Sequence, residues 1–299
     1  MQHAFRTTAI AALFALGTGL ATAATVSGGT SNAANVAPAA SAFPFDAGHA
    51  GLVFNNQSSF QIDLAGGPIH YADEAIDRGA DANGNYYLRG EDIGFLPGLL
   101  FGDIAQVWRN DVAYNGDTTT IHSFRQLITP SGILAGLVPD FGGLVVGKVE
   151  GSPVYFGEWS PKPGGTIPHA STDLNMSSAQ RTVWYVGENP TTSMPTLVNA
   201  QYNVVGINQH DPANPSVYQG VLTANYGSGG GYLNGSITRG SDAVDFGTGD
   251  TAITSTGAFS NTASTISGQF YGAQAEALAG IYTGGSSVQD YVAFGGARQ

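Results

Sequence analysis

Hydrophobic and polar positions alternate in short runs throughout the C-terminal half of the chain. Eight such runs, rich in β-branched and aromatic residues, are separated by glycine, asparagine and other turn residues. Short strands at this spacing are typical of all-β folds, and a closed barrel leaves no strand edge unpaired. We therefore predict an eight-stranded antiparallel β-barrel over residues 182–299, although spacing alone also allows an open sandwich. The runs cover residues 183–187, 200–206, 220–226, 232–237, 252–254, 264–270, 279–282 and 291–294.

Apolar alternation also occurs between residues 43 and 163, in a less regular form. The runs at 51–54, 60–64, 143–149 and 154–159 show the period of two that is typical of β-strands. No stretch of this region combines sustained helical periodicity with helix caps. We predict a second β-rich domain over residues 43–163, so that the whole fold is all-β. The residues 164–181, which are rich in Pro, Gly, Ser and Thr, are predicted to connect the two domains.

The first 23 residues have the pattern of a secretory signal peptide. Arg6 precedes an apolar stretch from Ala9 to Leu20, and small residues follow at 21–23. We expect cleavage near Ala23, followed by a flexible linker over the small and polar residues 24–42. The sequence has no cysteine, which excludes a disulfide framework and a lipid anchor on an N-terminal cysteine. These features predict a secreted protein that is not lipid-anchored.

The charge of the chain limits the partners that it can bind. The formal net charge is −12, with only 10 Lys and Arg residues. Such a chain repels phosphate backbones and anionic lipids, so we expect neither nucleic-acid binding nor membrane insertion. The motifs of serine hydrolases, zinc proteases, phosphate loops and dinucleotide-binding folds are also missing. We therefore expect a binding protein and not an enzyme.

The closing segments of the chain resemble a known family. Four motifs follow one another in the order found in the C-terminal barrel of transferrin-binding-protein-B-like surface proteins. The earlier segments 183–187 and 195–206 are similar to the narrower hemophilin branch of that group. The resemblance covers about Trp184 to Arg298, and the N-terminal half matches far less well. The four motifs lie at residues 268–272, 275–276, 278–280 and 293–296.

The resemblance implies a function as well as a fold. Hemophilins are secreted hemophores, in which a variable N-terminal ligand-binding domain precedes an eight-stranded barrel. They capture haem and deliver it to a TonB-dependent outer-membrane receptor, and their barrel is thought to engage a Slam-type outer-membrane translocator. Most members of the wider group carry a lipid anchor on a cysteine. This sequence lacks that cysteine, which favours the released, hemophore branch.

Haem iron needs one or two axial side chains, most often histidine. His49 is the first candidate because small neighbours would let a flat macrocycle approach the backbone. His122 is the second, since alternation places its imidazole on the face opposite Ile121 and Ser123. His70 is the third. Each of the three could instead be an ordinary turn or strand histidine, and the sequence does not decide whether one or two bind iron.

The remaining candidates are weaker. His169 and His210 lie in loop-like sequence and are predicted to be exposed. Four arginines of the N-terminal half could bind the haem propionates, although surface ion pairs are their default role. Two other functions stay open: an adhesin or host-factor binder that uses the same barrel for export, and a carrier of a small ligand other than haem. The four arginines are Arg78, Arg89, Arg109 and Arg125.

Overall fold

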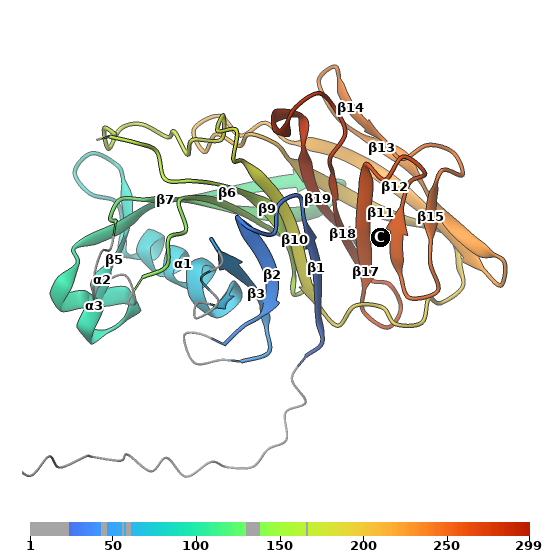
Figure 1. Cartoon of the computed structure of the whole chain (residues 1–299), viewed down its shortest axis with the longest axis horizontal. Coiled ribbons are helices and arrows are strands. Elements are labelled where there is room, and N and C mark those ends of the chain that lie inside the picture. Colours follow the sequence, from blue (N-terminus) through green and yellow to red (C-terminus); the bar gives the residue numbers. More distant parts are fainter. Residues whose placement is uncertain (1–23, 43–46, 56, 58–60, 130–137, 166) are drawn as a thin grey trace, which may run out of the picture.

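The computed structural model describes residues 24–42, 47–55, 57, 61–129, 138–165 and 167–299. It contains a broad antiparallel sheet, a smaller layer that covers one face of this sheet, and a β-barrel that packs on the other (Figure 1). The predicted signal peptide, residues 1–23, lies outside the described residues. Within the ranges that are described, no helix has the length and apolar character needed to cross a membrane.

The broad sheet has seven strands in the order β1-β10-β9-β8-β7-β6-β5. Every pair of neighbours is antiparallel. Side chains alternate between its two faces: Trp184 and Val186 point to the covering layer, whereas Val183 and Tyr185 point to the barrel. The strands are β1 (Val26–Thr30), β5 (Tyr86–Arg89), β6 (Asp103–Tyr114), β7 (Asp117–Gln126), β8 (Gly143–Lys148), β9 (Val154–Ser160) and β10 (Thr182–Glu188).

The covering layer combines a three-stranded sheet with one helix. Its strands β2, β3 and β4 pair antiparallel, and the helix α1 buries Ala72 and Ala75. Two shorter helices, α2 and α3, follow β5 at the outer end of the sheet (Figure 1). The elements are β2 (Val36–Ala40), β3 (Ala50–Phe54), β4 (Ile62–Asp63), α1 (His70–Arg78), α2 (Gly90–Ile93) and α3 (Phe95–Leu100).

The C-terminal region is an eight-stranded antiparallel barrel, which confirms the predicted barrel and the strand-rich fold. The ring runs β12-β11-β19-β18-β17-β16-β15-β13 and is closed by pairing of β12 with β13, while β14 extends β13 outside the ring. The strands are β11 (Leu197–Ile207), β12 (Tyr218–Gly227), β13 (Gly230–Arg239), β14 (Asp242–Asp245), β15 (Thr251–Ile253), β16 (Ala258–Ser260), β17 (Ile266–Tyr271), β18 (Ala277–Tyr282) and β19 (Val292–Arg298).

A buried ion pair joins the sheet to the loops of the barrel. The Arg181 Nε atom donates to Glu158 Oε2 at 2.7 Å, and both side chains are fully buried. Glu158 also accepts from the backbone N–H groups of Gln209 and His210, and Arg181 Nη2 donates to the carbonyl of Tyr291 at 3.0 Å. Because these bonds satisfy both charges, the pair fixes the barrel against the sheet.

Residues 24–42 are not a flexible linker as predicted, because they form β1 and β2. Their small side chains allow close packing. A Cβ atom on Gly28 would lie 2.3 Å from the carbonyl oxygen of Tyr185 and 2.7 Å from Pro38 Cβ. Val36 is fully buried in the core under the sheet. The Gly- and Ala-rich composition that suggested flexibility therefore serves close contact between strands.

Two further predictions need correction. The run 183–187 is β10 of the broad sheet and not a barrel strand, and the barrel takes the unpredicted β16 in its place. The described residues of the N-terminal half also contain three α-helices that the hydrophobic pattern did not indicate. In α1 the fully buried positions are alanines, which give a weak apolar signal, so no helical period stood out.

Candidate ligand site in the N-terminal region

The interior of the barrel is filled by its own side chains. Phe270 packs against Tyr202 and Phe259 with ring centroids 5.4 Å apart in both pairs, and Phe246 packs edge-on against Phe294 at 5.2 Å. All five rings are buried. An eight-stranded barrel is just wide enough for side chains to fill it. The site that could hold a ligand must therefore lie elsewhere in the described structure.

An apolar cavity of about 100 Å³ lies between the broad sheet and its covering layer. The sheet contributes Leu88, Ile104, Phe124 and Leu144. Tyr71 of α1 is the one lining residue whose side chain carries a polar atom. A dry apolar cavity binds flat or aliphatic groups in preference to charged ones. The covering layer contributes Phe54, Ile62, Gly67, Pro68, Tyr71, Ile93, Pro97, Val138, Pro139 and Phe141.

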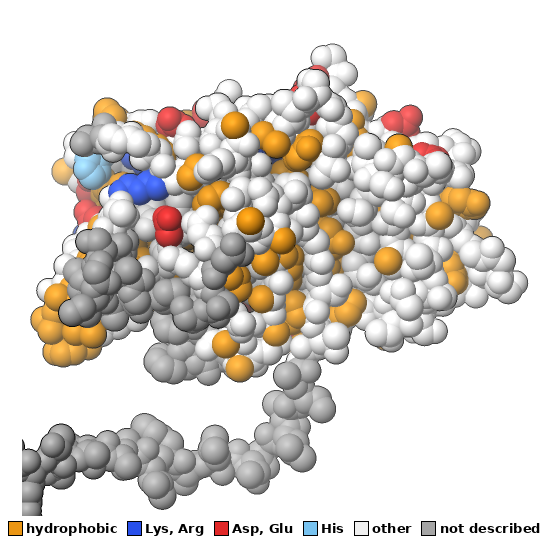
Figure 2. Space-filling model, in the orientation of Figure 1, with side chains coloured by type: hydrophobic (Ala, Val, Ile, Leu, Met, Phe, Trp, Pro, Cys, Tyr) orange, Lys and Arg blue, Asp and Glu red, His pale blue; other side chains and the backbone are white. Residues whose placement is uncertain are grey.

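The outer edge of this cavity meets an exposed apolar surface. Ile93 and Pro97 line the cavity, and four large side chains of α3 around them face solvent. Figure 2 shows orange side chains gathered at the lower left, where α3 lies in Figure 1. Exposed apolar groups of this kind mark interaction sites more often than chance. The four side chains are Phe95 (83% exposed), Leu96 (51%), Leu99 (67%) and Leu100 (46%).

His70 is the candidate histidine whose ring contacts a cavity-lining side chain, Tyr71. It starts α1 directly before Tyr71, and the two ring centroids are 5.4 Å apart. Its side chain is 54% exposed, and its Nε2 atom lies 3.4 Å from Glu74 Oε1. Burial, followed by the charges of Glu74 and Asp92, raises the pKa of the Tyr71 phenol. Tyr71 thus brings a neutral phenol to the cavity wall, and the imidazole of His70 contacts the Tyr71 ring from outside the lining.

His122 of β7 is buried beneath α1. Its Nε2 atom lies 2.9 Å from Asp73 Oδ1, and among the described residues its Nδ1 atom has no hydrogen-bond partner. Burial lowers the pKa of the imidazole, and the bond to Asp73 opposes this shift. His122 contacts α1 while Ile121 packs toward the barrel, which confirms the predicted alternation. A carboxylate that holds one ring nitrogen leaves the other available as a ligand.

His49 lies at the start of β3, next to the broad sheet. Its Nδ1 atom is 3.0 Å from Glu188 Oε1 on β10, and the side chain is 39% exposed. The contacts of the three histidines therefore lead to three different carboxylates: Glu188 for His49, Glu74 for His70 and Asp73 for His122. None of these contacts joins one candidate to another. In the described part of the chain, no cluster of three or more His, Cys, Asp or Glu side chains is arranged to hold a metal ion.

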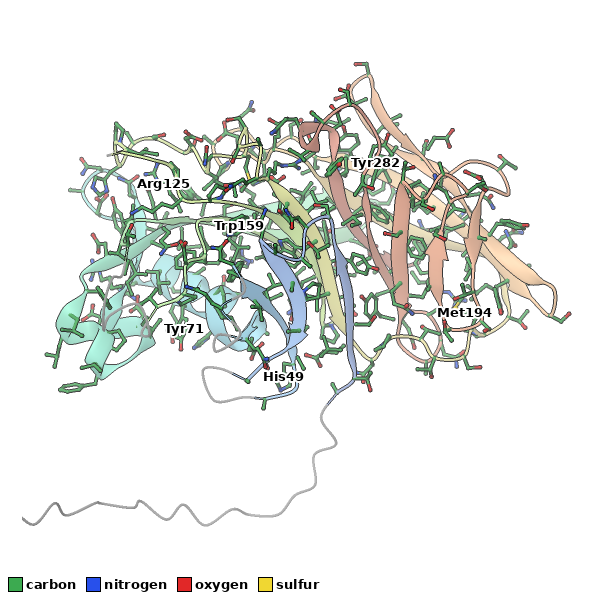
Figure 3. All side chains as sticks on the ribbon, in the orientation of Figure 1. His49, Tyr71, Arg125, Trp159, Met194 and Tyr282 are labelled. Atoms are coloured by element: carbon green, nitrogen blue, oxygen red, sulfur yellow. The ribbon has the colours of Figure 1, made fainter. Side chains whose placement is uncertain are left out.

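The four candidate arginines are divided between the two faces of the sheet. Arg78 pairs with Asp92 of α2, Arg89 pairs with Glu91 at 3.5 Å, and Arg109 pairs with Asp73 at 3.2 Å. Arg125 lies on the opposite face, because it follows the cavity-lining Phe124 in β7. Figure 3 places its label on one side of the sheet and that of Tyr71 on the other. Arg125 is therefore unsuited to a ligand of the apolar cavity.

Sequence reasoning missed Tyr71 and misplaced His210. Tyr71 stood beside His70 as one aromatic residue among many, and only the turn of α1 directs it into the cavity. His210 is not exposed as predicted: it is buried, and its Nε2 atom lies 3.1 Å from Asn110 Oδ1. His169 is exposed, as predicted. The burial of His210 depends on the sheet that packs against its loop, which no local pattern reveals.

Comparisons with known proteins agree with the barrel. Residues 192–298 match the family model described as the HphA C-terminal domain. Similar solved structures include a surface lipoprotein (10% identity, TM-score 0.30, covering 64% of this chain and 97% of that one). Another is a mutant of transferrin-binding protein B from Actinobacillus pleuropneumoniae H49 (10%, 0.30, 65% and 98%). A third is HpuA from Kingella denitrificans in complex with human haemoglobin (11%, 0.24, 65% and 84%). All strands of the barrel lie within the matched residues, so the barrel is similar to a hemophilin-type C-terminal domain.

Proposed function

We propose that this protein is a secreted haem-binding protein whose N-terminal region carries the ligand. The observation that supports this most is the apolar cavity lined by Tyr71, whose ring contacts His70, in a molecule whose barrel interior is filled. The hemophilin-type barrel adds support, because hemophilins are hemophores. Haem itself would supply a flat apolar macrocycle, two propionates and an iron ion with axial positions.

The side chains of the region have the chemical character that haem requires. The cavity lining is apolar, as the macrocycle requires, and Arg78 beside it offers a cation for a propionate. The cavity measures about 100 Å³, whereas small-molecule sites have volumes of about 300–1,000 Å³. Binding therefore requires the covering layer to move away from the sheet. Tyr71, Ile93 and Pro97 belong to this layer and would move with it.

His70, His122 and His49 remain the proposed iron ligands, and their surroundings rank them for testing. His70 comes first because it is accessible and contacts the cavity-lining Tyr71, which offers an oxygen ligand beside it. His122 comes second, since Asp73 orients its ring and its Nδ1 atom is buried without a partner among the described residues. His49 comes third because its ring contacts Glu188 on β10, outside the cavity lining.

The proposal extends to export and delivery. As a hemophilin-type domain, the barrel would engage a Slam-type translocator, and the loaded protein would pass haem to a TonB-dependent receptor. The filled barrel interior agrees with a barrel that serves in export and an N-terminal region that binds the ligand. A barrel that carries no ligand is free to act as a rigid docking element. In this proposal the protein binds and transfers its ligand without catalysing a reaction.

A haem titration followed by the Soret band tests the proposal. We expect saturable binding, a shifted band in His70→Ala, and a smaller change in Tyr71→Phe. Tyr232→Phe on the exposed surface of the barrel is the matched control for Tyr71 and should bind as the parent protein does. The proposed site is wrong if all three histidine variants and Tyr71→Phe leave the Soret band unchanged. Absence of a Soret band in the parent protein would refute haem binding altogether.

The exposed face of α3 supports a second candidate function, the binding of a host protein. A partner seated on Leu96 and Leu99 would lie directly at the edge of the cavity. Haemoglobin is the natural probe, because it would bring haem to this edge. If the face binds it, a Leu96→Ser/Leu99→Ser variant should bind immobilised haemoglobin at least about tenfold more weakly, with free haem titrating normally. Equal binding by the variant and the parent would exclude this face.

A further inference from the structure

A second pocket, on the other face of the broad sheet, gathers positive charge. It has a volume of about 350 Å³ and is lined in part by Arg125 of β7 and by Lys162 and His169 of the connection that follows β9. Figure 2 shows blue and pale-blue side chains side by side at the upper left, where this connection runs in Figure 1. In a chain of net charge −12, such a grouping is unusual.

Arg125 and Lys162 differ from most other cations of the described structure in having no carboxylate within 4 Å. Ion pairs involve five arginines, and neither Arg125 nor Lys162 takes part in one. Arg125 is nevertheless 1% exposed, and an arginine stays charged even when it is buried. Asp173 acts on this charge from more than 4 Å away, and a buried charge without a directly bonded counter-ion is costly, so this arrangement favours an anion. The five paired residues are Arg78, Arg89, Arg109, Arg181 and Arg239.

In the described structure, the hydrogen-bond acceptors of the Arg125 guanidinium are neutral, and the charge of Asp173 acts on it from further away. Its Nη2 atom donates to Gln106 Oε1 at 2.5 Å and to the carbonyl of Pro168 at 3.2 Å, and its Cζ atom lies 5.7 Å from the ring centroid of Trp108. In the described structure, its Nε and Nη1 atoms have no acceptor. The guanidinium thus hydrogen-bonds through Nη2 alone, and its Nε and Nη1 donors are buried without an acceptor among the described residues.

The ammonium group of Lys162 also donates its hydrogen bonds to neutral acceptors. Its Nζ atom donates to the carbonyl of Leu127 and to Thr129 Oγ1, each at 2.8 Å. An ammonium group has three donors, so one remains for a ligand. The rest of the lining includes the apolar residues Leu127, Pro163 and Ile167. A ligand that suits both parts carries one oxyanion group on a small apolar body.

We propose that this pocket binds a small organic carboxylate, with the carboxylate between Arg125 and Lys162 and the apolar body against Leu127 and Ile167. The site is separate from the apolar cavity. Phe124 lines that cavity and the next residue, Arg125, lines this pocket, so the sheet itself divides the two. The carboxylate site therefore does not depend on haem binding.

Thermal unfolding with sodium benzoate at constant ionic strength tests the site on the full-length protein. We expect a saturable rise in Tm with benzoate, a smaller rise with acetate and the smallest with inorganic phosphate. Lys162→Gln should weaken benzoate binding about tenfold, which corresponds to the loss of one charge-assisted hydrogen bond. Lys148→Gln is the matched control, because Lys148 lies on β8 outside the pocket, and it should bind as the parent does.

The outcomes separate clearly. Absence of a saturable shift with benzoate in the parent protein overturns the proposal, as does an equal shift in the parent and in Lys162→Gln. A phosphate effect as large as that of benzoate overturns the assignment to an organic acid. Because Lys162 is a half-buried loop residue, its variant should fold, and an unchanged near-UV circular dichroism spectrum checks this. An unchanged haem titration in Lys162→Gln would further support two separate sites.

Discussion

The barrel and the N-terminal region differ in how they pack their buried side chains and satisfy their buried polar groups. The barrel fills its interior with rings and satisfies its buried polar groups: the Tyr202 hydroxyl donates to the carbonyl of Ala275 at 2.6 Å. The N-terminal region keeps a cavity and several buried polar atoms without partners among the described residues, including His122 Nδ1 and Arg125 Nη1. Within the described structure, no unpartnered atom of this kind lies in a barrel strand.

This difference indicates where the two regions carry function. Buried polar groups are nearly always paired, and an exception often marks a place where a ligand or ion completes the arrangement. The barrel has no such exceptions in its strands and is suited to act as a stable unit. The sheet and its covering layer hold both proposed sites. The three tryptophans, Trp108, Trp159 and Trp184, all lie in the broad sheet, so fluorescence reports on that region alone.

The largest effect is expected from breaking the link between the two regions. Arg181→Met leaves Glu158 buried and unpaired, which should lower the free energy of unfolding by about 3–5 kcal/mol. Urea titrations followed by tryptophan fluorescence and far-UV circular dichroism measure this. Arg89→Met, which removes an exposed ion pair, is the matched control and should cost at most about 1 kcal/mol. Similar losses in both variants would contradict the role given to the buried pair.

A pair of phenylalanine variants compares the two cores directly. Phe294→Ala in the filled barrel should destabilise by about 3–5 kcal/mol. Phe124→Ala should cost less, because one side of that ring already borders a cavity and makes fewer contacts there. Chemical unfolding of both variants provides the measurement. If Phe124→Ala proves at least as costly as Phe294→Ala, the cavity does not loosen the packing of the N-terminal core.

The pH dependence of stability tests the burial of His210 at the boundary between the regions. Burial lowers its pKa below the ordinary 6.5, and Glu158 and Asp211 oppose this shift. As the pH falls below 6.5, His210 binds a proton more readily in the unfolded chain than in the folded protein. The stability of the folded protein therefore decreases. His210→Asn should therefore lose less Tm between about pH 7.5 and about pH 5 than the parent protein. An unchanged pH profile in the variant would show that His210 does not contribute.

The smallest effect is expected at the hairpin between β12 and β13. Gly230 has φ of +97°, and no atom lies within 4 Å of a Cβ placed there, so Gly230→Ala should cost about 1 kcal/mol through backbone strain alone. Its neighbour Gly229 has equally open space without a positive φ. Gly229→Ala is therefore the control and should be nearly neutral. If thermal unfolding shows equal Tm shifts for both variants, the backbone of the turn changes conformation to accommodate the added Cβ atom.

Much of the barrel could be predicted from the sequence. Its strands alternate regularly, so spacing and turn residues indicated most of them, and the closing motifs indicated the similarity to the family whose model matches residues 192–298. The N-terminal region was less accessible to this reasoning. The buried alanines Ala72 and Ala75 concealed α1, and the small residues around Gly28 suggested a linker where a strand packs closely. Local patterns record the period of an element and not the partner against which it packs.

The sequence by itself determined the strand-rich fold, the absence of disulfides and the excess of negative charge, since each follows from composition and local period. Only the tertiary structure decided that β10 belongs to the sheet, that Tyr71 faces a cavity, and that Phe124 and Arg125 serve different pockets. Those results depend on contacts between residues far apart in the chain. The pairing of Arg181 with Glu158 and the unpaired charge of Arg125 are of this kind, because a counter-ion is chosen by packing and not by position in the sequence.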